Sequence, residues 1–210
     1  MKLYHPFKQF SVGETAEIAE KALKDDKYLS RLVADGWCLS TTLQLRLFDL
    51  HLHVLENYLR NNSLDKEAEV MLCELEDDDL LDEYIGRHAV LLGKTLISQE
   101  FILALFKLSE PSANRHLLHC IREGVWFSPE VQVKLLKAPY GQDLLLRYLV
   151  PHTKYAHWIN ESRRDEIPLC QEAQMLLFDL PNAKEVIWFL TQTWKLCPKA
   201  EEIAGEKGFI

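Results

Sequence analysis

Hydrophobic and polar positions recur in the same order in five segments of this chain. Each segment begins with an apolar residue and a residue that suits a helix start, and an anchor residue follows two positions later. From the anchor, apolar residues recur at +1, +3, +5 and +8, which is too irregular for a strand and forms a broad helical stripe. The pattern therefore predicts a helix in each segment. The anchors are Thr42, Glu67, Glu100, Glu130 and Glu172.

A second apolar signal follows each anchor and predicts a second helix. In most segments it is an aromatic residue followed by an aliphatic residue. The spacing of this pair from other apolar residues places all of them on one face of a helix, which would be buried. Turn residues such as Pro139 and Pro181 separate the two signals. We therefore interpret each segment as a helical hairpin with the aromatic residue in the core. The pairs are Tyr58-Leu59, Tyr84-Ile85, Cys120-Ile121, Tyr148-Leu149 and Phe189-Leu190.

Self-similarity in a fixed order indicates a stacked architecture, because one hairpin cannot bury its apolar face without neighbours. The predicted fold class is all-α, an α-solenoid in the form of a superhelical stack of about five helical hairpins with terminal caps. Residues 1–38 are expected to form N-terminal capping helices, 39–195 the tandem hairpins with an insertion at 150–168, and 196–210 a C-terminal cap. The register requires four leucines to be equivalent and buried: Leu72, Leu105, Leu135 and Leu177.

The segments resemble those of bacterial proteins built from tandem short helical hairpins, which are similar to HEAT and leucine-rich-repeat-variant α-solenoids. The shared pattern is close to S-x-E-A-x-x-x-L-F, a turn, and L-L-x-x-Y-I, and it matches best at 65–85, 128–149 and 172–190. Thr42 and Cys120 depart from it. The resemblance covers most of the chain, and it implies protein or peptide binding along a curved surface, with no catalytic residues to carry over.

Composition narrows the classes of partner and compartment. The 210 residues are 48% hydrophobic and 27% charged, which is globular, and the net charge of −8 disfavours both nucleic acid and anionic membranes as partners. No apolar run approaches the ~20 residues of a membrane span. The five scattered cysteines include no C-x-x-C pair, which indicates free thiols in a reducing compartment. We expect a cytoplasmic protein, with secretion by a signal-less system left open.

Two clusters of side chains contain residue types that could bind a metal ion or a charged partner. Seven carboxylates lie between Glu74 and Glu83, without the alternation and turn glycine of a calcium loop, and we interpret them as a solvated turn followed by an acidic helix start. A docking patch for a basic partner is the alternative. His116 and His119 have the spacing of two metal ligands, but no second ligand pair lies nearby. The sequence also has no nucleophile elbow and no glycine-rich phosphate loop, so we predict no catalytic residue, metal or cofactor.

The best candidate for a binding strip is the residue immediately before each pair in the second helices. This position varies in chemistry but recurs in geometry, and second helices usually line the concave face of α-solenoids. We therefore predict a non-catalytic protein–protein interaction module that binds a protein or peptide along this face, with Arg147 and Trp188 exposed. The strip residues are Asn57, Glu83, His119, Arg147 and Trp188.

Two alternatives stay open. The first is a HEAT-like nucleic-acid-binding or base-excision protein with a basic groove, which would use arginines on or near the second helices: Arg60, Arg87, Arg122 and Arg147. The second is a helical enzyme with an unrecognised polar pocket that holds a buried carboxylate or histidine.

Overall fold

The computed structural model describes residues 14–91, 94–154, 169–192 and 194–210. The chain is all-α, as predicted, with a short antiparallel hairpin of β1 (Val90–Leu91) and β2 (Lys94–Thr95) between α6 and α7. The helices are α1 (Glu14–Lys24), α2 (Asp26–Ala34), α3 (Thr41–Leu47), α4 (Leu52–Leu59), α5 (Lys66–Glu74), α6 (Asp78–His88), α7 (Gln99–Leu105), α8 (Glu110–Arg122), α9 (Pro129–Lys137), α10 (Gly141–Lys154), α11 (Gln171–Leu176), η3 (Leu177–Asp179), α12 (Ala183–Thr191) and α13 (Pro198–Glu206).

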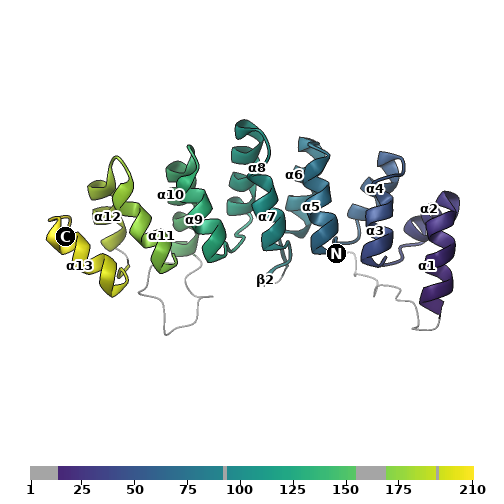
Figure 1. Ribbon diagram of the computed structural model, residues 1–210, viewed down its shortest axis with the longest axis horizontal. Helices are drawn as coiled ribbons and strands as arrows, with labels where there is room; N and C mark the ends of the chain where they lie inside the picture. Colours follow the sequence, from purple (N-terminus) through teal and green to yellow (C-terminus); the bar gives the residue numbers. More distant parts are fainter. Residues whose placement is uncertain (1–13, 92–93, 155–168, 193) are drawn as a thin grey trace.

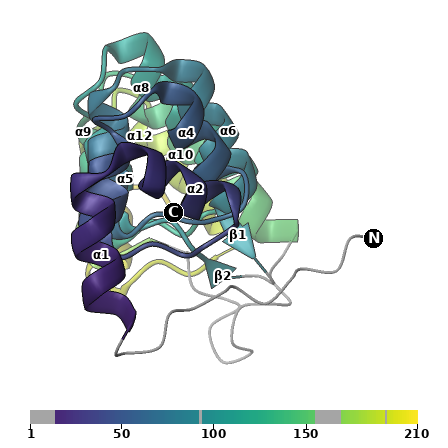
Figure 2. The same cartoon turned by 90° about the vertical axis from the view of Figure 1, so that its right-hand side faces the viewer.

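The helices form a row of antiparallel pairs, which Figure 1 shows side by side from one terminus to the other. The odd-numbered helices from α1 to α13 each contact the next odd-numbered helix, and they form one layer of the row. The even-numbered helices form the second layer, in which α2 contacts α4, and α8 contacts both α6 and α10. Figure 2, a view along the row, shows the two layers end on. We call the two layers the first-helix layer and the second-helix layer.

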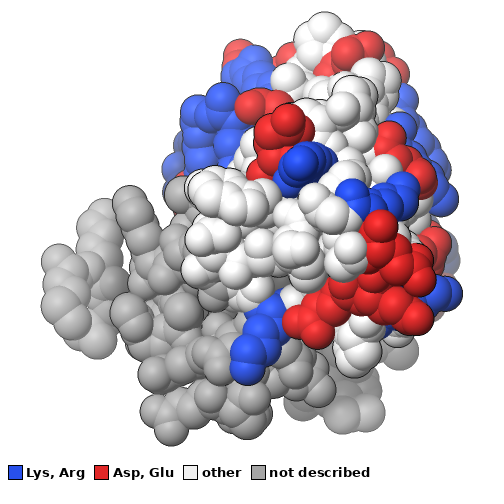
Figure 3. Space-filling view, turned by 90° about the vertical axis from the view of Figure 1, so that its left-hand side faces the viewer, with Lys and Arg blue, Asp and Glu red and all other residues white. Residues whose placement is uncertain are grey.

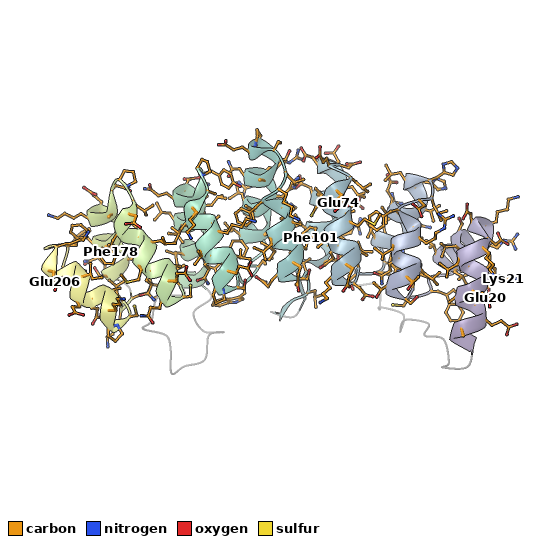
Figure 4. All side chains as sticks on the ribbon, in the orientation of Figure 1. Glu20, Lys21, Glu74, Phe101, Phe178 and Glu206 are labelled. Carbon is orange, nitrogen blue, oxygen red and sulfur yellow. The ribbon has the colours of Figure 1, made fainter. Side chains whose placement is uncertain are left out.

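The core lies between the two layers. Leu72, Leu105, Leu135 and Leu177 are each 0% exposed, which confirms that all four are buried. Leu177 begins the short 3₁₀ segment η3, whereas the other three lie in α-helices. Phe101 lies at the middle of the row in Figure 4, whereas Glu20 and Glu206 mark its two ends. Phe101 meets the ring of Tyr84 edge to face, with 5.6 Å between the ring centroids.

One aromatic of the predicted core is outside it. Phe189 is 53% exposed, and Leu190 is buried in its place together with Val186 and Ile187. The buried residues of α12 follow the i, i+1, i+4 spacing of one helix face, from which the neighbouring residue Phe189 is rotated by about 100°. The sequence register in this segment is therefore wrong by one residue, because it followed aromatic character rather than helical spacing.

A polar side chain in each first helix from α3 to α11 connects that helix to the next one. Its side-chain oxygen accepts a hydrogen bond from the backbone N–H of the residue that caps the following first helix. We call these five bonds the junction ladder. They run from Asp65 to Gln44 (2.7 Å), Ser98 to Glu69 (2.9 Å), Ser128 to Gln99 (2.7 Å), Cys170 to Gln132 (2.7 Å) and Cys197 to Gln174 (2.7 Å).

The glutamines of the junction ladder are bonded at both ends. The amide nitrogens of Gln44, Gln132 and Gln174 each donate to the carbonyl of the residue before their own helix cap, at 2.9 Å. All three side chains are buried, so a lost partner would leave a desolvated polar group. In the third segment Ile102 occupies the corresponding position, and Gln99 takes over the connection from one turn earlier.

The tyrosines of the second helices have a polar role besides filling the core. The hydroxyl oxygens of Tyr58, Tyr84 and Tyr148 accept hydrogen bonds from backbone N–H groups in the connections before α3, α5 and α9, at 3.1–3.3 Å. A phenylalanine would leave these buried N–H groups without that acceptor. This explains why the recurring aromatic is tyrosine in these three helices.

Part of the predicted insertion belongs to a helix. Residues 150–154 are the end of α10, and 155–168 lie outside the described residues, as do 1–13 of the predicted N-terminal cap. Over the described ranges, no helix combines the length and apolar character that crossing a bilayer requires.

Gln174→Met should lower the free energy of unfolding by about 1–3 kcal/mol, because it keeps the length of the side chain but leaves the N–H of Cys197 and the carbonyl of Leu169 without their partner. Urea unfolding followed by circular dichroism measures this change. Gln171→Met, at an exposed position of the same helix, is the matched control and should change stability by less than about 0.5 kcal/mol. Equal effects of the two substitutions would contradict a stabilising ladder.

Candidate interaction surface

The structure places the predicted strip residues on the second helices, and their exposure differs. Asn57 and Arg147 are exposed, and Trp188 is 57% exposed, which confirms the expectation for Arg147 and Trp188. Glu83 and His119 are half-buried. Four of these residues directly precede the buried pair of their helix, so they face the same side of the second-helix layer.

In α12 the position that corresponds to Arg147 is held by Phe189, because Leu190 is the buried residue there. Trp188 lies next to it in sequence. Two large aromatic side chains at consecutive positions of one short helix are therefore both more than half exposed. Gln142 at the start of α10 donates to the side chain of Asn182, the N-cap of α12, at 2.6 Å, so the two helices are connected at their first turns. We call Trp188 and Phe189 the α12 aromatic pair.

The C-terminal end of the row, near which α12 lies, has an area without charged side chains. Figure 3 faces the C-terminal end of the row and shows uncharged side chains over its middle, with acidic and basic groups around them. Aromatic residues with a polar rim are the usual composition of a protein-binding site. Of the α12 aromatic pair, Trp188 belongs to the predicted strip, whereas Phe189 was predicted to lie in the core.

The arginines of the second helices are largely paired with carboxylates. Arg87 contacts Glu83 at 3.0 Å, Arg60 approaches the same carboxylate at 4.0 Å, and Arg147 pairs with Asp143 at 2.8 Å. Phosphate binding relies on clustered cations whose charge is not already balanced. Three of the four arginines named for the nucleic-acid alternative thus have an acidic neighbour, and this observation disfavours a basic groove.

A cluster of polar and charged side chains, with His116 buried at its centre, joins α6 to α8. His116 is 0% exposed, and its two ring nitrogens lie 2.9 Å from Asp82 and 2.8 Å from Asp78. His119 approaches Asp82 at 3.1 Å through Nδ1, and Arg115 pairs with the same carboxylate. His116 occupies the helix position that Leu80 and Leu144 fill in α6 and α10, so this pair of helices replaces an apolar contact by a hydrogen-bonded polar one.

The cluster lowers the pKa of both aspartates. For Asp78 the main cause is the hydrogen bond from His116. For Asp82, burial is the largest single influence and favours the neutral form, but the hydrogen bonds from His119, Arg115 and His116 together outweigh it. Charged aspartates with donors on every side are typical of a structural cross-link between helices.

Two features noted in the sequence, the His116–His119 pair and the acidic run, meet in this arrangement. Among the described residues no group of histidine, cysteine and carboxylate side chains suits a metal ion, and both nitrogens of His116 face aspartates instead. The acidic run contains the acidic helix start that the sequence predicts, because Asp77 caps α6 through the N–H of Leu80 and Asp78 lies in the first turn of that helix. The contacts of Asp78 and Asp82 with α8 are an addition that the sequence did not predict.

A second buried titratable group belongs to the junction ladder. Glu69 is 1% exposed, and its carboxylate accepts from the Tyr84 hydroxyl at 2.8 Å and from the N–H of Ser98 at 2.9 Å. Burial raises its pKa above the usual 4.5, although the hydrogen bonds from Ser98 and Tyr84 act in the opposite direction.

Neither buried group has the setting of a catalytic site. Every oxygen of Glu69 and nitrogen of His116 faces a partner within the fold. Two grooves of about 320 and 570 Å³ are lined by other residues. These observations do not favour the enzyme alternative.

Two of the five cysteines are buried in the core. All five are free thiols, and burial raises the pKa of Cys73 to about 12 and also raises that of Cys120. Since the thiolate is the reactive form, these two buried side chains behave as small apolar residues.

Comparison with protein-family models, with curated proteins and with solved structures finds no match for this chain. The resemblance to tandem helical-hairpin proteins therefore stays a prediction from the sequence.

Glu69→Gln should raise stability at neutral pH by about 1 kcal/mol, because the glutamine can form the same bonds as Gln44 and Gln132, which already coexist with Tyr58 and Tyr148. The gain should depend on pH. A carboxyl whose pKa is raised by folding stabilises the protein fully below its unfolded pKa of about 4.5, and this stabilisation is lost as the pH rises through the folded pKa.

The advantage of Glu69→Gln should accordingly grow between pH 4 and pH 8 in urea unfolding experiments. Glu67→Gln makes the same charge change at an exposed position of α5 and serves as the control. A pH-independent difference between Glu69→Gln and the parent protein would show that Glu69 is not destabilised by burial.

Proposed function

We propose that this protein is a non-catalytic interaction module, an α-solenoid of helical-hairpin repeats that binds a partner protein through its second-helix layer. The observation that carries the proposal is the α12 aromatic pair, in which Trp188 and Phe189 are 57% and 53% exposed. Tryptophan and other aromatic residues dominate the energetics of protein interfaces, because they bury a large area with little loss of conformational freedom.

The row of helix pairs supports this reading. Each pair contacts its sequence neighbours, so the array presents an extended surface, and the residues that face out of the second-helix layer vary from Asn57 and Glu83 to Arg147. An invariant inward face with a variable outward face is typical of repeat proteins that bind other proteins. We expect the partner to lie along this face and to place an apolar group against the aromatic pair, with Arg147 contributing at its rim.

Combining Trp188→Ala with Phe189→Ala tests the proposal. Both side chains are mainly exposed, so the double substitution should change the free energy of unfolding by no more than about 1 kcal/mol. Partner capture from the native lysate, quantified by mass spectrometry, should fall about 30-fold for the specific partner, which corresponds to about 2 kcal/mol.

The matched control combines Leu23→Ala with Leu52→Ala, which removes two exposed leucines near the other end of the row. It should retain the partner. Equal capture by the parent protein and the aromatic variant would contradict binding through α12. Tight binding of duplex or single-stranded DNA at physiological salt would instead favour the nucleic-acid alternative.

A further inference from the structure

The turns that connect the two helices of each pair lie along one edge of the row. This edge has a groove of about 320 Å³ between the ends of α7 and α9. We call it the α7–α9 groove. Phe106 and Leu108 form one side and Tyr140 the other, and all three are half-buried against the core. Lys134, Lys137 and Glu110 supply the charged groups of its lining. None of these residues belongs to the second-helix strip, so this site is separate from the one proposed above.

The turn between α9 and α10 gives the groove a fixed wall. The N–H of Gly141 bonds to the carbonyl of Ala138 at 2.9 Å, which closes the turn that contains Tyr140. A Cβ atom at Gly141 would lie 1.8 Å from the carbonyl oxygen of Leu135, so only glycine allows the chain to pass this close to the end of α9. The position of the Tyr140 side of the groove is therefore imposed by the backbone.

The charge of the groove differs from that of the whole chain. Lys134 and Lys137 lie one turn apart in the last turn of α9, and neither forms an ion pair with a described residue. The ammonium group of Lys134 lies over the ring of Phe106, 5.2 Å from its centroid. Glu110 is the acid in this lining, so the groove has an excess of positive charge on a protein of net charge −8.

The other groove on this edge has a different lining. The α2–α3 groove, of about 570 Å³, is lined by Lys27 and Arg31 and by Asp26 and Asp49, and Arg46 pairs with both aspartates, at 2.8 and 2.9 Å. Its apolar lining consists of Leu50 and Val54, whereas Phe106, Leu108 and Tyr140 line the α7–α9 groove. The α7–α9 groove is therefore the one of the two that combines an excess of basic groups with a large apolar surface.

We propose that the α7–α9 groove binds a peptide segment of a partner protein in which acidic side chains flank a large apolar side chain. The apolar group would lie against Phe106, Leu108 and Tyr140, where it replaces water on half-buried carbon surface. The carboxylates would meet Lys134 and Lys137, which lie at neighbouring positions of one helix face. Both features are needed, because exposed ion pairs alone contribute less than about 1 kcal/mol each.

The test uses a fluorescein-labelled synthetic peptide in which aspartates flank a leucine and a phenylalanine, with fluorescence anisotropy as the readout. Two comparison peptides replace the aspartates by asparagines or the two apolar residues by alanines. The acidic apolar peptide should bind at least 10-fold more tightly than either, and its affinity should fall as the salt concentration rises.

Combining Lys134→Glu with Lys137→Glu should weaken binding of this peptide at least 10-fold. The matched control combines Lys184→Glu with Lys199→Glu, which makes the same net charge change at exposed positions of α12 and α13. It should weaken binding less than threefold. Thermal melting of both variants establishes that they are folded.

Several results would overturn the proposal. These are equal binding of the neutral peptide, an equal loss in the two charge-reversal variants, or no binding at millimolar peptide. The acidic turn of this chain, which includes the exposed Leu75, combines acidic and apolar side chains as the proposed peptide does. Dimerisation in sedimentation experiments that Lys134→Glu with Lys137→Glu abolishes would therefore assign the groove to a second copy and overturn the partner assignment.

The variant with Trp188→Ala and Phe189→Ala separates this inference from the proposed function. It should bind the peptide as the parent protein does, since the aromatic pair lies on another layer of the row. Loss of peptide binding in that variant would place the peptide on α12 and overturn the groove assignment.

Discussion

The structure depends on how each helix pair satisfies the backbone N–H groups where the next pair begins. A helix start leaves N–H groups without intrahelical partners, and in a stacked row these groups are shielded from water by the neighbouring pair. The junction ladder meets this requirement with one side-chain oxygen per junction, from Gln44 to Gln174. Because the acceptor belongs to the preceding pair, each helix start is correctly bonded only when its neighbour is folded. The hydrogen bonds thus reinforce the same nearest-neighbour dependence that burial of the apolar faces creates.

The middle of the row departs from this scheme, and other side chains in the same helices replace the missing contacts. In α7 the ladder position is Ile102, and Gln99 makes the connection from one turn earlier. In α8 the tyrosine position is Cys120 and an apolar position is His116, whose two nitrogens face aspartates of α6. This contact constrains the geometry, because each ring nitrogen of His116 must meet its own carboxylate. It requires α8 to meet α6 in one register, which an apolar surface alone would define less sharply.

The sequence predicted the helical class and the buried leucines because those depend on spacing, which the sequence states directly. Leu105 and Leu135 are buried where the stripe places them. The ladder glutamines could also have been found, since Gln or Glu recurs two positions after the anchor in four segments. They do not belong to the apolar stripe, so the hydrophobic pattern alone does not indicate them. The misassigned Phe189 has the converse cause, since chemical type was given more weight than helical period.

The binding surfaces were less accessible to sequence reasoning, because they depend on which side chains remain unpaired after folding. Arg147 was predicted to be exposed and is, but its partner Asp143 reduces the charge that it offers to a ligand. Lys134 and Lys137 carried no signal in the sequence, because a lysine pair on a helix face usually indicates only solvent exposure. The two lysines matter because Gly141 allows the turn with Tyr140 to lie close to α9. They also matter because acidic side chains of other helices already pair with other basic groups. In an acidic array, binding sites are therefore easier to find from charged and aromatic side chains that have no partner within the fold than from the residues that recur in every segment.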